Sequence, residues 1–194
     1  MTAALAKAVW LVCAVAWYVI RYPHERRARK TPVRRSARGR REILLLSISL
    51  TGLGILPMLY VATGFPRFAD YAFVPAQGWI GTLAFAVSLW LFYRTHRELG
   101  RNWSVTLEVR DKHALITDGV YRRVRHPMYT AFWLWAVAQA FLLPNWIVGP
   151  AGLIGFGTLF FFRVAREEKL MLEAFGGQYR DYMARTARII PWIY

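Results

Sequence analysis

Cysteine is almost absent from this 194-residue chain, since Cys13 is the only one. One cysteine excludes a disulfide framework and any CxxC site. Histidine is also rare. The four histidines are His24, His96, His113 and His126, and they form no HExxH motif and no paired spacing on a helix. We therefore expect no metal site in this protein.

A glycine-rich phosphate loop is missing as well. Two Gly-x-Gly motifs, at 52–54 and 155–157, lie inside apolar runs. In such runs small residues most often allow helices to pack closely. The sequence also contains no internal repeat, and its length suits one bundle with a cytoplasmic cap.

Acidic residues are scarce, with 11 Asp and Glu against 26 Lys and Arg, which gives a formal net charge of +15. A balance of this kind can indicate nucleic acid or anionic lipid as a partner. The densest basic run, 34–41, however lies between two long apolar runs. There it is explained by the orientation of a membrane protein against an anionic leaflet. We expect membrane lipids, and no nucleic acid, as its partner.

The chain is instead rich in apolar sequence, being 56% hydrophobic with nine Trp, ten Tyr and twelve Phe. A membrane-spanning helix needs roughly 20 mostly apolar residues. Five runs are candidates: 8–20, 43–62, 78–93, 128–143 and 146–162. The fourth is short, and only Pro144 and Asn145 separate it from the fifth, which predicts a helical hairpin. The predicted fold class is an all-α integral membrane bundle of about five transmembrane helices with a small cytoplasmic cap.

The basic residues predict the orientation of these helices. Ten Lys and Arg fall in 21–41, seven in 97–125 and six in 163–194, whereas the opposite loops hold little more than Arg67. Because Lys and Arg accumulate in cytoplasmic loops, we expect the N-terminus outside and the C-terminus inside. Lys7 alone makes a thin n-region, so the first helix is predicted to be a span rather than a cleaved signal peptide. The chain is short and strongly basic, which suggests a prokaryotic plasma membrane.

Two parts follow from this organisation. Residues 1–95 are expected to hold the first three transmembrane helices with the basic cytoplasmic loop 21–42. Residues 96–194 are expected to hold a catalytic half, made of a cytoplasmic loop, two further helices and C-terminal cytoplasmic helices.

The loop before the fourth helix is too long to be a mere connection. Its residues 105–109 alternate as in a strand, and 113–116 form a second short extended piece. It ends in Gly119–Tyr129, where Pro127 suits the first turn of the fourth helix. The free N–H groups of a helix N-terminus can bind an anionic or polar ligand.

The fifth helix is expected to continue past the membrane through 163–174 and to end at Gly176-Gly177. Arg163 and Glu167 stand one helical turn apart in it, with Glu168 beside them. A short helix should begin at 178–182, and 188–194 should form an aromatic tail at the membrane interface.

Each of these features also has a purely structural interpretation. An exposed Arg163–Glu167 pair would contribute only about 0.2–0.5 kcal/mol to helix stability. The arginines of 122–125 could simply set topology, and Tyr121 and Tyr129 could be interface aromatics. Their combination at one end of adjacent helices, joined by a structured loop, favours a binding site.

The ordered motifs resemble the isoprenylcysteine carboxyl methyltransferase family, and the paired glutamates are also similar to those of phospholipid N-methyltransferases. The resemblance covers about 99–194 and rests on three patterns: Leu99-Gly100-x-x-Trp103-Ser104, Leu115-x-x-x-Gly119-x-Tyr121-x-x-x-Arg125-His126-Pro127-x-Tyr129 and Arg163-x-x-x-Glu167-Glu168. It implies an integral membrane enzyme that uses S-adenosylmethionine without a Rossmann fold and releases S-adenosylhomocysteine.

The resemblance also assigns residues. Those expected to bind the cofactor are His113, Ala114, Leu115 and Ile116 on the adenosine side, with Tyr121, Arg125, His126, Pro127, Met128, Tyr129 and Glu167 around the rest of it. Arg163, Glu167 and Glu168 are the expected catalytic residues, with Arg163 facing the carboxylate of a lipophilic or prenylated acceptor. Thr106 stands where some relatives carry a cofactor-contacting Gln.

Two other interpretations stay open on the sequence. Membrane sterol reductases, which bind NADPH, share an Arg-His-Pro-x-Tyr motif, although this chain is about half the length expected for them and its paired glutamates suit the methyltransferases better. A membrane scaffold would leave the polar loop and the paired acids unexplained. The acceptor could be a carboxylate, a thiol or an amine, and the oligomeric state is equally open.

Overall fold

The computed structural model describes residues 1–28, 33–36, 39–100, 108–110 and 115–193. Its long helices are α1 (Ala3–Ala28), α4 (Pro75–Leu99), α5 (Pro127–Leu142) and α6 (Val148–Phe175), together with a composite helix of α2 (Arg40–Leu50), the π-helical turn η1 (Thr51–Ile55) and α3 (Leu56–Thr63). Shorter elements are the 3-10 turns η2 (Arg67–Ala69) and η4 (Gly119–Arg122) and the helix α7 (Gly177–Arg185).

The helical prediction is confirmed, with one helix shorter than a full span. The helices α1, α2–α3, α4 and α6 are each long and apolar enough to cross a membrane. The predicted run 128–143 forms α5, which has only 16 residues. The observed helices extend beyond the predicted apolar runs at most ends, because polar residues continue a helix once it leaves the hydrocarbon region.

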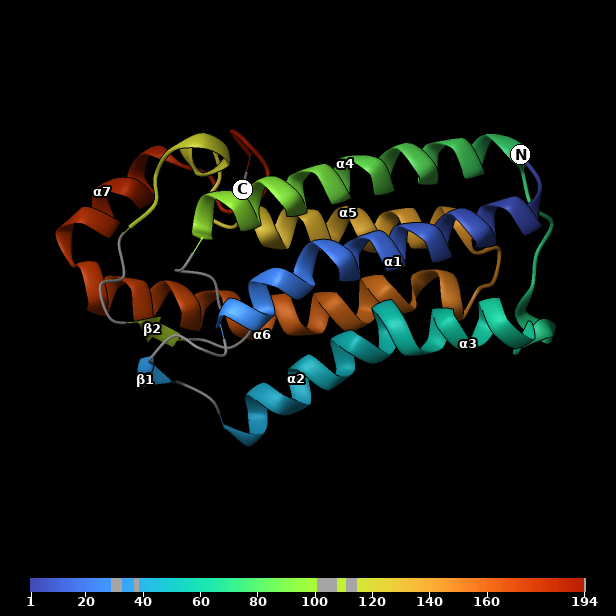
Figure 1. Cartoon of the computed structure of the whole chain (residues 1–194), viewed down its shortest axis with the longest axis horizontal. Helices are drawn as coiled ribbons and strands as arrows, with labels where there is room; N and C mark the ends of the chain where they lie inside the picture. The colour runs from blue at the N-terminus through green and yellow to red at the C-terminus, as the bar shows by residue number, and fades with distance from the viewer. Residues whose placement is uncertain (29–32, 37–38, 101–107, 111–114, 194) are drawn as a thin grey trace.

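The long helices lie side by side in one bundle (Figure 1). Helix α5 packs against both α4 and α6, α1 lies against α4, and α2–α3 runs along α6. The N-terminus lies at the opposite end of the bundle from α7 and the C-terminal tail. Trp10, Tyr60, Phe85 and Phe156 fill the core, while large apolar side chains such as Leu83 cover the outside, as expected for helices that face lipid.

The predicted α5–α6 hairpin is confirmed, and Asn145 holds its turn together. The Asn145 side chain is fully buried. Its Nδ2 donates to the Pro66 carbonyl and to Asp70, both at 2.7 Å, and its Oδ1 accepts from the Val148 backbone N–H at 2.9 Å. This one side chain therefore satisfies the backbone groups that the turn exposes.

A small two-stranded ribbon lies outside the helices. β1 (Val33–Ser36) pairs antiparallel with β2 (Glu108–Arg110), with Val33 opposite Arg110. β2 falls at the end of the predicted extended region 105–109, the rest of which lies outside the described residues. The basic loop was not predicted to form a strand, so β1 is an addition to the all-α prediction.

The glycine motifs bring α6 very close to η1. A Cβ on Gly52 would lie 2.3 Å from the Ala151 carbonyl oxygen, and one on Gly155 would lie 2.8 Å from that of Ile48. The π-helical turn also lets the Gly52 carbonyl accept from Gln139 Nε2 at 3.0 Å. A freed backbone group inside a membrane needs such an internal partner.

This packing predicts different outcomes for two neighbouring glycines. Gly52→Ala should lower the free energy of unfolding by about 1–3 kcal/mol, because the new methyl group collides with backbone that cannot move aside. Gly54→Ala is the control, since its Cβ would meet only a Leu50 methyl at 3.4 Å. Thermal unfolding in detergent measures both, and equal stability of the two variants would contradict the packing argument.

Candidate functional site

The N-terminus of α5 is held against the C-terminal tail by backbone hydrogen bonds. The Ala187 N–H donates to the Arg123 carbonyl at 3.1 Å, and the Arg125 N–H donates to the Ala187 carbonyl at 2.8 Å. The His126 N–H then donates to the Arg188 carbonyl at 3.0 Å. Two segments that are about sixty residues apart in sequence therefore fix the start of α5, where Pro127 occupies the predicted first-turn position.

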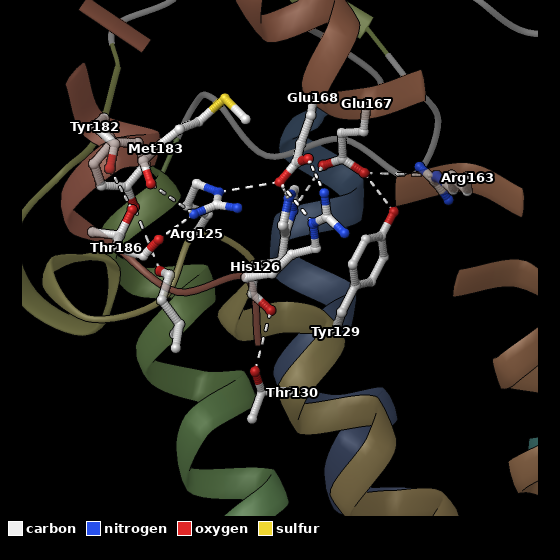
Figure 2. Close-up of polar contacts among 12 residues, drawn as sticks. Arg125, His126, Tyr129, Thr130, Arg163, Glu167, Glu168, Tyr182, Met183 and Thr186 are labelled. Carbon is white, nitrogen blue, oxygen red and sulfur yellow. Dashed lines mark hydrogen bonds and ion pairs between the residues drawn. The ribbon is translucent and has the colours of Figure 1, made fainter. Parts of the chain in front are cut away.

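Glu168 on α6 is the buried charge at the centre of this contact. It is 4% exposed. Its carboxylate accepts from Arg125 Nε at 3.1 Å and from Arg188 Nη2 at 2.8 Å, and it lies 3.3 Å from His126 Nε2 (Figure 2). Arg125 also donates to the carbonyls of Met183 and Thr186. Buried charges need such pairing and hydrogen bonding to offset the loss of water.

Glu167 is the next residue, yet its surroundings differ. Its side chain is 32% exposed, against 5% for that of Glu168. The Tyr129 hydroxyl donates a short hydrogen bond to it, and His126 Nδ1 lies 3.9 Å from its Oε1. Figure 2 shows these side chains converging from α5 and α6. Glu167 thus stays accessible while fixed partners hold its orientation.

Arg163 completes this group one turn earlier on α6. Its Nε lies 3.9 Å from Glu167 Oε2, which confirms that the two side chains share a face of the helix. Its Nη1 lies 3.3 Å from Oε1 of Glu42, at the start of α2. Arg163 is only 8% exposed and Glu42 only 2%. The structural interpretation as an exposed helix pair is therefore wrong, because the arginine is buried and is paired across the bundle.

The cap beyond these residues is a cluster of tyrosines. Tyr121 of η4 packs with Tyr179 and Tyr182 of α7, with Leu115 and Ile116 against the cluster. The Tyr182 hydroxyl donates to the Tyr121 carbonyl at 2.6 Å. Burial raises the pKa of all three phenols, so each remains a neutral hydrogen-bonding group.

Glu98 joins the cap to the end of α4. Its Oε2 accepts from the Val120 backbone N–H at 2.8 Å, and its Oε1 accepts from Arg94 Nη2 at 3.0 Å. The carboxylate approaches Gly119 so closely that a Cβ there would lie 2.4 Å from it. Gly119 also has a φ of +60°, which favours glycine. The close contact with Glu98 and the positive φ together explain why residue 119, two positions before Tyr121, is glycine.

The predicted site residues thus divide into four groups. Arg125, His126, Tyr129, Arg163, Glu167 and Glu168 converge at one end of α5 and α6, while Leu115, Ile116 and Tyr121 lie in the cap. Met128 instead packs toward Leu91 and Phe92 of α4. His113 and Ala114 lie outside the described residues, as do Trp103, Ser104 and Thr106. In the described ranges no three His, Cys, Asp or Glu side chains gather to hold a metal.

Sequence reasoning missed two members of this arrangement, Arg188 and Glu42. Arg188 was expected only as part of the tail, and nothing in its spacing relates it to Glu168. For Glu42 a signal existed, because it is the only acidic residue between Glu25 and Asp70. An isolated acid at the edge of a predicted span is costly unless it has a partner.

Comparison with known proteins adds independent findings. Residues 79–173 match the model of the isoprenylcysteine carboxyl methyltransferase (ICMT) family. A protein-S-isoprenylcysteine O-methyltransferase of Dictyostelium discoideum is 36% identical over 91 residues, which cover 45% of this chain and 37% of that protein. A "Probable protein-S-isoprenylcysteine O-methyltransferase" of Oryza sativa subsp. indica is 29% identical over 164 residues, covering 80% and 84% of the two chains.

The structure of the eukaryotic intramembrane Ras methyltransferase ICMT is among the solved structures with a similar fold. It aligns with a TM-score of 0.54 and 24% identity. The alignment covers 81% of this chain and 55% of that one, so this chain spans only about half of the solved protein. The likeness confirms the helical membrane fold.

The buried cluster around Glu168 predicts a large effect on stability. Glu168→Ala should lower the free energy of unfolding by about 3–5 kcal/mol, because Arg125 and Arg188 lose the carboxylate that balances their charge. Glu173→Ala, an exposed position on the same helix, should change it by less than about 1 kcal/mol. Thermal unfolding in detergent compares the two. A Glu168→Ala chain as stable as the Glu173→Ala control would refute the structural role of the cluster.

Proposed function

Because this chain belongs to the isoprenylcysteine carboxyl methyltransferase family, we propose that it transfers a methyl group from S-adenosylmethionine to a prenylcysteine-type carboxylate. The observation that carries the proposal is the position of Glu167 between Tyr129 and Arg163. An accessible acid and a buried arginine lie there side by side, at the end of the bundle where the cap begins.

The residues present fit the cofactor. S-adenosylmethionine carries an ammonium and a sulfonium, and the accessible carboxylate of Glu167 suits a cation of this kind. The apolar side chains of Leu115 and Ile116, with Tyr121, would contact the adenosine, and His113 and Ala114 are proposed to extend that surface. The N-terminus of α5 and His126 would supply donors for the cofactor's carboxylate. Arg125, Pro127 and Met128 would support this surface from behind.

The acceptor is proposed to meet Arg163. A guanidinium can hold a carboxylate by two parallel hydrogen bonds, which fixes the orientation of the attacking oxygen. When bound, S-adenosylmethionine supplies the electrophilic methyl group: an acceptor oxygen bonds to its carbon as the carbon–sulfur bond breaks and the electron pair stays on sulfur. A carboxylate needs no general base for this attack. The protein therefore contributes mainly position and exclusion of water.

Glu168 is proposed to act on the site through its neighbours. Its contacts with Arg125, His126 and Arg188 hold the start of α5 against the tail. In this way it would position His126 and leave contact with the cofactor to Glu167. Glu168 is thus proposed to be a positioning residue, and not the catalytic residue that the family resemblance implied.

The proposed site opens toward the cytosol. The described residues of the basic segments, the cap and the C-terminal tail lie at one end of the bundle, and the N-terminus lies at the other. By the positive-inside rule this supports an outside N-terminus and a cytoplasmic site, in a prokaryotic plasma membrane. Residues 96–194 would form the catalytic half on a scaffold of residues 1–95. The lipid acceptor would enter from the bilayer and the polar cofactor from the cytosol.

Binding of two cofactors distinguishes this proposal from a reductase. The detergent-purified chain should bind S-adenosylhomocysteine, measured by calorimetry, and should not bind NADPH. Glu167→Gln should raise the Kd for S-adenosylhomocysteine at least about tenfold, since the neutral side chain no longer attracts the ligand's ammonium. This change corresponds to about 1.4 kcal/mol of binding free energy. Glu173→Gln, exposed on the same helix, is the matched control and should bind as the unaltered chain does. NADPH binding in place of S-adenosylhomocysteine would refute the proposal.

A further inference from the structure

Glu42 is a buried acid that comes from the opposite half of the chain to the rest of the proposed site. It lies in the first turn of α2, where the basic loop meets the membrane helix. That position lies outside the matched residues 79–173. Its side chain is 2% exposed, and its Oε1 lies 3.3 Å from Nη1 of Arg163. This contact joins the second span to the proposed reaction centre.

Stability alone explains this pair poorly. Burying two charges costs several kcal/mol per ion, and the attraction between them repays this cost only when the geometry is excellent. Here the contact is an ion pair without a directed hydrogen bond, since Oε1 of Glu42 accepts none from the described residues. Charge-assisted hydrogen bonds are usually about 2.7–2.9 Å long. A purely structural pair would be expected to have better geometry.

The pair does constrain the direction of Arg163. Glu42 attracts Nη1 from α2, while Glu167 lies 3.9 Å from Nε on α6 itself. The guanidinium is thus held at two of its three nitrogens by carboxylates on two different helices. The guanidinium is planar, so contacts at two of its nitrogens fix the plane of the whole group. A planar group held in this way has a defined edge for an incoming carboxylate.

We infer that Glu42 is a positioning residue that orients Arg163 for the carboxylate of the acceptor. This inference rests on the proposed function and extends it, because it makes the N-terminal half of the chain part of acceptor recognition. It predicts that Glu42 affects acceptor binding through Arg163 and leaves cofactor binding nearly unchanged.

The test measures acceptor kinetics and cofactor binding on the same full-length variants. With N-acetyl-S-farnesylcysteine as acceptor, Glu42→Ala should raise KM at least about tenfold, or about 1.4 kcal/mol. The Kd for S-adenosylhomocysteine should stay within about threefold. Glu42→Gln keeps an oxygen for the Nη1–H donor and should recover most of the lost acceptor affinity. Glu25→Ala is the control, since it removes an acid from a partly exposed pair with Arg21 at 3.2 Å.

A double-mutant cycle shows whether the effect passes through Arg163. In an Arg163→Ala background, replacing Glu42 by Ala should change the acceptor KM less than twofold, because the group that it orients is gone. An unchanged or lower acceptor KM in Glu42→Ala would overturn the inference. So would a parallel rise in the Kd for S-adenosylhomocysteine, which would mean that Glu42 supports the fold. A chain that binds no S-adenosylhomocysteine and transfers no methyl group would instead overturn the proposed function, and the inference with it.

Discussion

The burial of the Glu168 carboxylate among Arg125, His126 and Arg188 is the interaction on which the rest of this structure depends. A charge this far from water must be paired, and its partners come from the start of α5 and from the C-terminal tail. Pairing it therefore fixes where the tail lies against α5. It also fixes His126, and so links the order of the cap to the packing of the membrane helices.

The same geometry explains why Glu167, the neighbouring acid, stays partly exposed. Consecutive residues on a helix point about 100° apart, so Glu167 faces a different set of partners from Glu168, with His126 close to both. It faces Tyr129 and Arg163 and stays partly exposed. Glu168 is thus buried in ion pairs while Glu167 stays accessible, and we therefore propose different functions for the two glutamates. The proposed methyl transfer uses this difference, since a cationic cofactor needs an acid that remains accessible.

Much of the fold could be predicted because its signals are local. Apolar runs, Pro127 and the glycine at 176 marked the helices and their ends, and the four-residue spacing placed Arg163 beside Glu167. Contacts between distant segments could not be predicted in this way. Arg188 reaches Glu168 from the tail that follows α7, and Glu42 reaches Arg163 from another helix. No periodicity relates such pairs, because they depend on how the helices pack.

Transfer of the methyl group is the measurement that tests the account most directly. The purified chain would be incubated with S-adenosylmethionine labelled at its methyl group with deuterium, and with N-acetyl-S-farnesylcysteine. Mass spectrometry would then locate the label. The account predicts a labelled methyl ester, which mild alkali hydrolyses with release of labelled methanol. The unaltered chain should form this ester, and Glu167→Ala should not. Label on another atom of the acceptor, or no transfer although S-adenosylhomocysteine binds, would contradict the assignment of a carboxylate acceptor to Arg163.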